Sequence, residues 1–136
     1  KSYFLISATF DLSKRIEKYS SSVDNIYFRE HQQPKGNSCG SFFKNPVIDR
    51  EFFLKQFPQL IDSCPKKISA GYLLEQSGLK GFSYGGAYFS EKHTNFLMHN
   101  GQGKWTDMIY LIQYAQEKVY EKFGVNLENE VQIITP

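Results

Sequence analysis

The sequence is poor in the features that mark disulfide-bonded, metal-binding or membrane-spanning chains. Its 136 residues contain only two cysteines, Cys39 and Cys64, with no CxxC pair and no cluster of cysteine and histidine. One pair of cysteines excludes a disulfide scaffold, and a structural zinc ion usually takes four such ligands. No apolar run approaches the ~20 residues that cross a bilayer, and no signal peptide is visible. We therefore expect free thiols in a reducing, cytoplasmic compartment, with neither a metal ion nor a membrane as partner.

An excess of charge of one sign is also lacking. The 16 Lys and Arg residues oppose 14 Asp and Glu residues, a formal net charge of +2, which excludes a strongly basic nucleic-acid arm and an acidic tail. Aromatic residues are abundant instead, with 12 Phe and 9 Tyr in a chain that is 40% hydrophobic. That composition supports one folded domain with a core. Because the first residue is Lys1 and a strand-like segment follows at once, we interpret the chain as a piece of a longer polypeptide.

The order of residue patterns predicts an α+β fold, a small mixed or antiparallel sheet packed against helices. Strand-like segments are Tyr3–Leu12, Ala87–Ser90, Thr94–His99 and Val131–Ile134. Turn-forming residues predict a loop at Gln32–Ser41.

Capping residues and the spacing of apolar residues predict three helices. These are Arg50–Phe57 after the cap Asp49, Ala70–Ser77 after the cap Ser69, and a long helix from its cap Thr106 to Gly124. The polar Ser13–Asp24 segment is either a helical turn or a linker, and Asn25–Arg29 fits either a short strand or a helix end.

The segment Gly36–Pro46 (GNSCGSFFKNP) places the hydroxyl of Ser41 close to the carboxamide of Asn45. Phe42 and Phe43 cannot both point away from a core, so they are expected to anchor the segment. Residue types alone favour an ordinary turn in which Ser41 bonds its own backbone. Nucleophilic serine chemistry has little support, because the GxSxG pattern is absent.

Two carboxylates near the end of the chain, Glu128 and Glu130 in LENEV, share one face if this segment is extended. They are either solvated side chains on an edge strand or include one carboxyl held in a cleft as an acid or electrostatic partner. Arg29, Lys35 and Lys44 flank the loop around Ser41 and are either phosphate ligands or surface charges. We call Gly36–Pro46 the serine segment.

The segment Lys80–Phe89 (KGFSYGGAYF) offers a rival interpretation, because it resembles the ribonucleoprotein signature of RNA-recognition domains. In that module exposed aromatic side chains stack on bases. The match is weak, because Gly85-Gly86 interrupts the strand and no partner motif lies upstream. A non-enzymatic RNA-binding module remains the alternative to an enzyme domain. A third hypothesis is a binding or interaction domain that has kept the fold of an enzyme but lost its activity.

Four stretches, in this order, resemble the C-terminal domain of the UDP-N-acetylenolpyruvoylglucosamine reductase (MurB) family. They are Gly40–Pro46 (GSFFKNP), Ala70–Gly81 (AGYLLEQSGLKG), Gly86–Ser90 with His93–Leu97, and Phe123–Val131 (FGVNLENEV). The stretches GSFFKNP and LENEV are the most specific, and together the four cover the chain from about Arg29 to its end.

The resemblance implies the substrate-binding domain of a bacterial, cytoplasmic flavoenzyme of peptidoglycan synthesis. In this family NADPH reduces FAD, and the reduced flavin reduces UDP-N-acetylenolpyruvoylglucosamine to UDP-N-acetylmuramate. Residues 1–22 would be the last strand of a preceding FAD-binding domain with a linker, and residues 23–136 the substrate-binding domain. Without that FAD-binding region as its partner, the chain is expected neither to hold FAD tightly nor to reduce substrate.

The resemblance also implies roles for single residues. Ser41 matches the family's serine that protonates the enolate, and Glu130 matches the glutamate that acts in the same step. A buried, protonated Glu130 would be able to hydrogen-bond the enolate. Asn45 matches a substrate-binding asparagine, and an arginine of the preceding domain has no counterpart in this chain.

Further substrate contacts are expected of Arg29, Gln32, Lys44, His93 and Asn95. The family often has a basic residue just before the proline at the entrance of the loop around Ser41, where this chain has the stretch Arg29–Pro34 (REHQQP). If Gln32 takes the place of a lysine, contacts to phosphate or sugar would be weaker here or moved to Lys35. A lone histidine such as His93 is, from residue type alone, more often structural.

Overall fold

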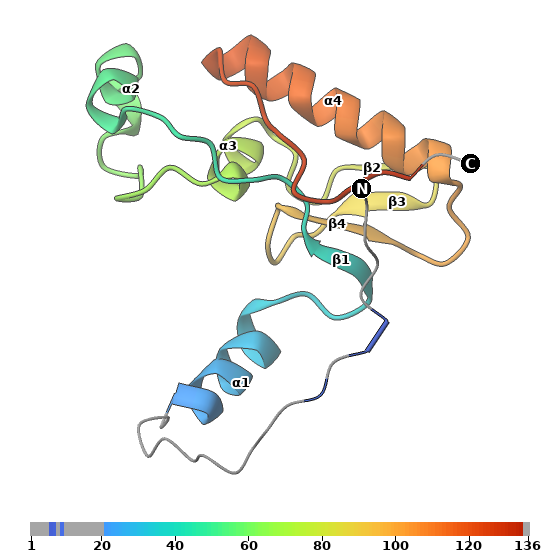
Figure 1. Ribbon diagram of the computed structural model, residues 1–136. Coiled ribbons are helices and arrows are strands. Elements are labelled where there is room, and N and C mark those ends of the chain that lie inside the picture. The colour runs from blue at the N-terminus through green and yellow to red at the C-terminus, as the bar shows by residue number, and fades with distance from the viewer. Residues whose placement is uncertain (1–5, 8, 10–20, 135–136) are drawn as a thin grey trace.

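The computed structural model describes residues 6–7, 9 and 21–134 (Figure 1). Its helices are α1 (Ser21–Gln32), α2 (Arg50–Gln56), α3 (Ala70–Gln76) and α4 (Trp105–Phe123), with a short 3-10 helix η1 (Pro58–Leu60). Its strands are β1 (Asn37–Ser41), β2 (Ser83–Tyr84), β3 (Ala87–Phe89) and β4 (Phe96–His99). The strands form one antiparallel sheet in the order β1-β4-β3-β2. The α+β fold predicted from the sequence is confirmed.

The core lies between α4 and one face of the sheet, across which α4 runs (Figure 1). Leu111, Ala115 and Val119 recur at helical spacing on α4 and are fully buried. They meet Phe89 of β3 and Leu97 of β4, which belong to the same buried cluster. Apolar burial of this kind is the main favourable term in folding, so α4 and the central strands form the scaffold on which the loops are carried.

The caps predicted for α2 and α3 and the predicted end of α4 are confirmed. The carboxylate of Asp49 accepts the Phe52 N–H (2.7 Å), and the hydroxyl of Ser69 accepts the Tyr72 N–H (3.1 Å). Gly124 ends α4 in the left-handed conformation (φ 66°), which glycine adopts without a steric penalty.

The predicted start of α4 is corrected. The helix begins at Trp105, so Thr106 lies inside it and Lys104 is the cap. The cause is Asp107, whose carboxylate accepts the N–H groups of both Gly86 and Lys104 (3.0 Å each). These two hydrogen bonds also hold the pKa of Asp107 below its usual value.

Two further sequence predictions are corrected. Part of the predicted loop, Asn37–Ser41, is strand β1, because it pairs with β4. Turn-forming residue types do not predict such pairing, which depends on the tertiary context. The predicted strand Val131–Ile134 is not formed, and ladder pairing in this part of the chain is limited to one bridge between Phe43 and Asn129.

The remaining predictions concern the N-terminal part. Asn25–Arg29 and residues 21–24 belong to α1, so the helical alternative holds there. The predicted strand Tyr3–Leu12 lies almost wholly outside the described residues, and the boundary placed after residue 22 stays a prediction. Among the helices that the structure describes, none is long and apolar enough to span a membrane.

Candidate functional site

The site is built on the chain that leaves β1 at Ser41. On one side, the Phe42 N–H donates to the Asn95 carbonyl (2.7 Å). On the other side, the Glu130 N–H donates to the Phe42 carbonyl and the Lys44 N–H donates to the Glu128 carbonyl, both at 2.8 Å. Segment 128–130 therefore runs beside segment 42–44, and the backbone of Glu130 is bonded to the residue that follows Ser41.

The two phenylalanines of this segment are anchors, as the sequence predicted. Phe42 and Phe43 are 3% and 1% exposed, and their rings pack edge to face with centroids 5.2 Å apart. Ser41 itself is exposed at the end of β1. A solvent-facing hydroxyl is thus carried by a backbone whose next two side chains are buried.

The side chain of Asn95 holds this segment from the sheet side. Its Oδ1 accepts the Phe43 N–H (2.9 Å), and its Nδ2 donates to the Phe43 carbonyl (2.8 Å). The residue is 3% exposed. Asn95 was expected to contact substrate, but burial and the two bonds to Phe43 give its carboxamide a structural partner instead.

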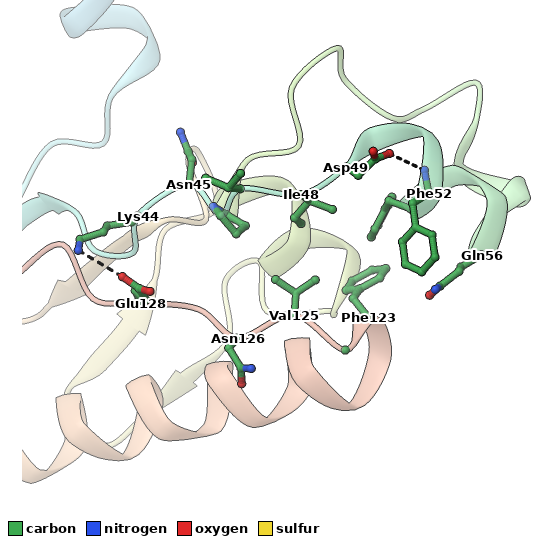
Figure 2. A pocket seen from close by; sticks show the side chains of 14 residues that line it. Lys44, Asn45, Ile48, Asp49, Phe52, Gln56, Phe123, Val125, Asn126 and Glu128 are labelled. Carbon is green, nitrogen blue, oxygen red and sulfur yellow. Dashed lines mark hydrogen bonds and ion pairs between the residues drawn. The ribbon is translucent and has the colours of Figure 1, made fainter.

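Asn45 links the serine segment to α3. Its Oδ1 accepts the N–H of Ala70, the first residue of α3 (3.0 Å), which satisfies a helix N–H group that has no partner within the helix. The Asn45 side chain keeps an amide nitrogen as a donor, which points away from α2 (Figure 2). One side chain can therefore place the helix and still offer a hydrogen bond to a ligand.

The LENEV segment alternates as the sequence predicted. Leu127 is buried, Glu128 and Glu130 are exposed, and Asn129 and Val131 are half-buried. The expectation of a buried Glu130 is not met in this chain, because its face of the segment is open to solvent.

Sequence reasoning assigned no partner to Glu128, which forms an ion pair with Lys44 (Nζ to Oε2, 3.3 Å). Both side chains are more than half exposed, and such pairs contribute about 0–1 kcal/mol. This ion pair is not predictable from the sequence alone, because it depends on the pairing of segments 42–44 and 128–130.

A hollow of about 780 Å³ lies next to this pairing, between the end of α4 and α2 (Figure 2). Lys44 and Glu128 stand at one end, and Phe52 stands at the other. Phe123 and Val125 line it between these ends. Its walls combine polar groups with aromatic and aliphatic side chains, as ligand pockets do.

A second hollow, of about 620 Å³, is lined by Lys35, Tyr88, Lys92 and Met98 together with the Gly85-Gly86 turn. Ser41 and Glu130 line neither hollow. The structure thus brings their backbone segments together, while neither of these two hollows encloses their side chains.

The other expected contact residues are more dispersed. His93 is exposed, its Nδ1 accepts the Asn95 N–H (3.3 Å), and its ring lies against Phe96 (4.9 Å between centroids). Arg29 and Gln32 are exposed on the last turns of α1, which stands apart from the sheet (Figure 1). The geometry groups His93 with the serine segment but not Arg29 or Gln32.

The aromatic side chains of the segment behind the RNA-binding alternative are largely engaged within the chain, and even the exposed Tyr84 (47%) stacks on Tyr110 of α4 with ring centroids 3.9 Å apart. Phe89 is fully buried, and Phe82 stacks on Tyr114 of α4 with ring centroids 5.0 Å apart. A Cβ atom on Gly86 would lie 2.2 Å from the Cα of Gly103. These aromatic and glycine residues serve the contact between the sheet and α4, so the geometry does not favour base stacking.

Comparison with known proteins decides between these readings. A family model described as the C-terminal domain of UDP-N-acetylenolpyruvoylglucosamine reductase (MurB) matches residues 32–134. The chain belongs to this family. The match includes the serine segment, both central strands and the LENEV segment.

Individual relatives agree with the family model. The chain is 45% identical over 102 residues to a UDP-N-acetylenolpyruvoylglucosamine reductase of Campylobacter jejuni. This alignment covers 75% of the chain and 32% of that protein. It is 37% identical over 136 residues to the enzyme of the same name from Fervidobacterium nodosum, covering 98% of the chain and 38% of the relative.

A solved structure is also similar. The crystal structure of UDP-N-acetylenolpyruvylglucosamine reductase (MurB) from Thermus caldophilus matches with a TM-score of 0.56 and 31% identity. The match covers 81% of this chain and 32% of that one. The MurB domain described here therefore spans about a third of the length of its relatives.

Proposed function

We propose that this MurB domain is the substrate-binding part of a reductase that converts UDP-N-acetylenolpyruvoylglucosamine to UDP-N-acetylmuramate in the bacterial cytoplasm. The reaction uses FAD and NADPH and supplies a precursor of peptidoglycan. One observation carries the proposal: segment 42–44 pairs with segment 128–130, so that Ser41 and Glu130 come from adjacent backbones although they are far apart in sequence.

The proposed chemistry assigns separate tasks to these two residues. When bound by the whole reductase, FAD would supply a hydride to the β carbon of the enolpyruvyl group, and negative charge would then develop on the carboxyl side of that group. Ser41 gives its hydroxyl proton to the α carbon, which is a strong base in the enolate. Once the rest of the reductase covers it, Glu130 in its protonated form donates a hydrogen bond to the developing charge, as a positioned donor does most effectively where water is excluded.

Both side chains are exposed in this chain, and a reactive enolate has to be kept from water. We therefore assign the other wall of the active site to the part of the relatives that this chain does not match. The catalytic arginine expected by family resemblance belongs to that part as well.

The substrate contacts that we propose lie around the same segment. Lys44 offers a cation and Asn45 offers an amide donor at the rim of the larger hollow. His93 is next to Asn95 in the adjoining turn. Arg29 and Gln32 on α1 complete the proposed set, and the Lys92 Nζ donates to the Glu30 carbonyl (3.5 Å), which links α1 to the turn that carries His93.

The described residues do not form a cradle for the flavin. A glycine pair is the natural candidate for close approach to a phosphate, but Gly85 and Gly86 are packed against Asp107 and Gly103. We assign FAD and NADPH to the unmatched part of the relatives. The chain alone is accordingly expected to bind no flavin tightly and to be inactive.

The test is Ser41→Ala in the full-length reductase, followed as two half-reactions. Loss of a positioned proton donor lowers a rate by roughly 100- to 10,000-fold, and we expect this loss when substrate reoxidises the reduced flavin. Flavin reduction by NADPH should be unchanged. Stopped-flow absorbance of the flavin measures both steps.

Ser63→Ala is the matched control, because Ser63 is an exposed serine beyond η1, where its hydroxyl contacts only the Leu60 carbonyl (3.4 Å). Equal losses in both half-reactions of Ser41→Ala would remove Ser41 from the proton-donor role. Failure of the unmodified reductase to consume the UDP-sugar would reject the proposed function itself.

A further inference from the structure

Four hydrogen bonds hold the turn between β3 and β4, which fixes the place of Asn95 before any ligand binds. The hydroxyl of Ser90 accepts the N–H groups of Lys92 (3.1 Å) and His93 (3.3 Å). The backbone of Phe96 closes the turn, since its N–H donates to the His93 carbonyl (2.9 Å) and its carbonyl accepts the Ser90 N–H (3.0 Å). Asn95 therefore projects from a rigid turn.

From that turn Asn95 makes three bonds to the serine segment. Its carboxamide bonds both polar backbone groups of Phe43, and its own carbonyl accepts the Phe42 N–H. A carboxamide has a donor and an acceptor side by side, which matches the N–H and C=O of one residue. Without it, both Phe43 groups would be buried without a partner, at a cost that is larger than the gain from an average hydrogen bond.

The bonds continue to the other side of the same segment. The carbonyl of Phe42 and the N–H of Lys44 hold the C-terminal segment through Glu130 and Glu128. A continuous set of hydrogen bonds thus runs from Asn95 through Phe42 and Phe43 to Glu130. Ser41 directly precedes Phe42 in this set.

We propose that Asn95 is a positioning residue that sets the backbone of Ser41 and Glu130 for proton transfer, an inference that rests on the proposed function. The Asn95 carboxamide already bonds both polar backbone groups of Phe43, so this role needs no contact between Asn95 and substrate or flavin. It acts by holding Phe43, so its removal displaces the two proposed catalytic residues relative to each other. Displacements of about 1 Å can cost roughly 100-fold in rate.

The first experiment is hydrogen exchange on the chain itself, with Asn95→Asp and Asn95→Ala compared with the unmodified protein. The Phe43 amide loses its acceptor in Asn95→Ala, so we expect its exchange to accelerate by roughly 10- to 100-fold. The Glu130 amide should accelerate as well, although Asn95 does not touch it. Amides in the core of α4, such as that of Ala115, should change less.

Thr94→Val is the matched control. Thr94 precedes Asn95 in the same turn, is 3% exposed, and has a hydroxyl with no hydrogen-bond partner among the residues that the structure describes. We expect this variant to leave the exchange of Phe43 and Glu130 unchanged. Uniform acceleration of all core amides in the Asn95 variants would indicate a merely structural residue and overturn the proposal.

The second experiment uses the full-length reductase with Asn95→Asp, which keeps the shape of the side chain. As a carboxylate it still accepts the Phe43 N–H but cannot donate to the Phe43 carbonyl. We expect reoxidation of the reduced flavin by substrate to slow by roughly 100-fold at neutral pH and to recover as acid protonates the new carboxyl. Flavin reduction by NADPH should not change.

The outcomes separate the two proposals. An active unmodified reductase whose Asn95→Asp variant slows both half-reactions equally, or shows no recovery in acid, contradicts the role of Asn95 and leaves the proposed function intact. An unmodified reductase that does not act on the UDP-sugar rejects both proposals. Selective acceleration of Phe43 and Glu130 exchange together with the acid-dependent recovery supports the positioning role.

Discussion

The chain contains the dipeptide Phe-Phe twice, and its two copies have different surroundings. Phe42 and Phe43 follow strand β1 and are both buried. On helix α2, Phe53 is 3% exposed whereas Phe52 is 61% exposed. Identical residues in identical order thus bury two side chains at the proposed site and one beyond it.

The difference follows from backbone geometry and from what covers each segment. The backbone of Phe42 is bonded to Asn95 on one side and to Glu130 on the other, and the rings of Phe42 and Phe43 pack against each other in the core (5.2 Å between centroids). Neighbours on a helix are about 100° apart, and α2 is covered on one side, where Phe53 lies near Phe57 (4.9 Å) and Phe123 (5.6 Å). The serine segment is therefore fixed from both sides, while α2 is fixed from one.

Among the substitutions in the two dipeptides, Phe43→Ala should lower the free energy of unfolding the most. Truncating a fully enclosed phenylalanine costs about 3–5 kcal/mol, and we expect the upper part of that range because hydrogen bonds hold the Phe43 backbone in place and limit collapse of the cavity. Urea unfolding of the chain measures the loss as a lower midpoint at unchanged slope. A cost below about 1 kcal/mol would show that the two-sided enclosure does not stabilise the fold.

Phe53→Ala should cost less than Phe43→Ala. Phe53 is buried, but it lines the hollow beside α2, so the short helix can settle toward Phe57 and Phe123 after truncation. We expect about 3 kcal/mol, the lower end of the range for buried phenylalanine. The same urea titration compares the two variants, and a larger loss for Phe53→Ala would reverse the proposed ranking of the two regions.

The parts of the fold that depend on local chemistry were predictable from the sequence. Asp49 and Ser69 cap their helices by contacting residues three positions away, and Gly124 ends α4 through its own backbone freedom. Strand β1 was predicted as a loop, because its glycine, serine and asparagine residues become a strand only through pairing with β4. Val131–Ile134 has the composition of a strand but no ladder partner among the described residues.

The residues of the site also separate into those predictable from the sequence and those that depend on long-range contacts. Family resemblance selects Ser41 and Glu130, and residue types identify Asn45 as a versatile amide. The task of Asn95 was not predictable, because its partner Phe43 is 52 positions away in sequence. Long-range hydrogen bonds to backbone groups leave no local pattern, and the exposure of Glu130 likewise depends on what covers its segment.

The smallest effect is expected from Phe52→Ala, the exposed member of the second dipeptide. Its side chain is mostly in water, so truncation should change the unfolding free energy by less than about 0.5 kcal/mol. Alanine also has a higher helix propensity than phenylalanine, which offsets the small loss of apolar contact at the hollow. The Phe52 N–H is a backbone group, so its hydrogen bond to the Asp49 carboxylate survives the change.

Asp49→Ala is the positive control for the small effect expected of Phe52→Ala. Removal of that cap should cost about 1 kcal/mol through the same helix, which shows that the unfolding measurement senses α2. If Asp49→Ala registers and Phe52→Ala does not, α2 contributes through its cap and through Phe53 alone. If Phe52→Ala costs as much as Phe53→Ala, the exposed face of α2 is covered in solution, and the contrast between the two dipeptides disappears.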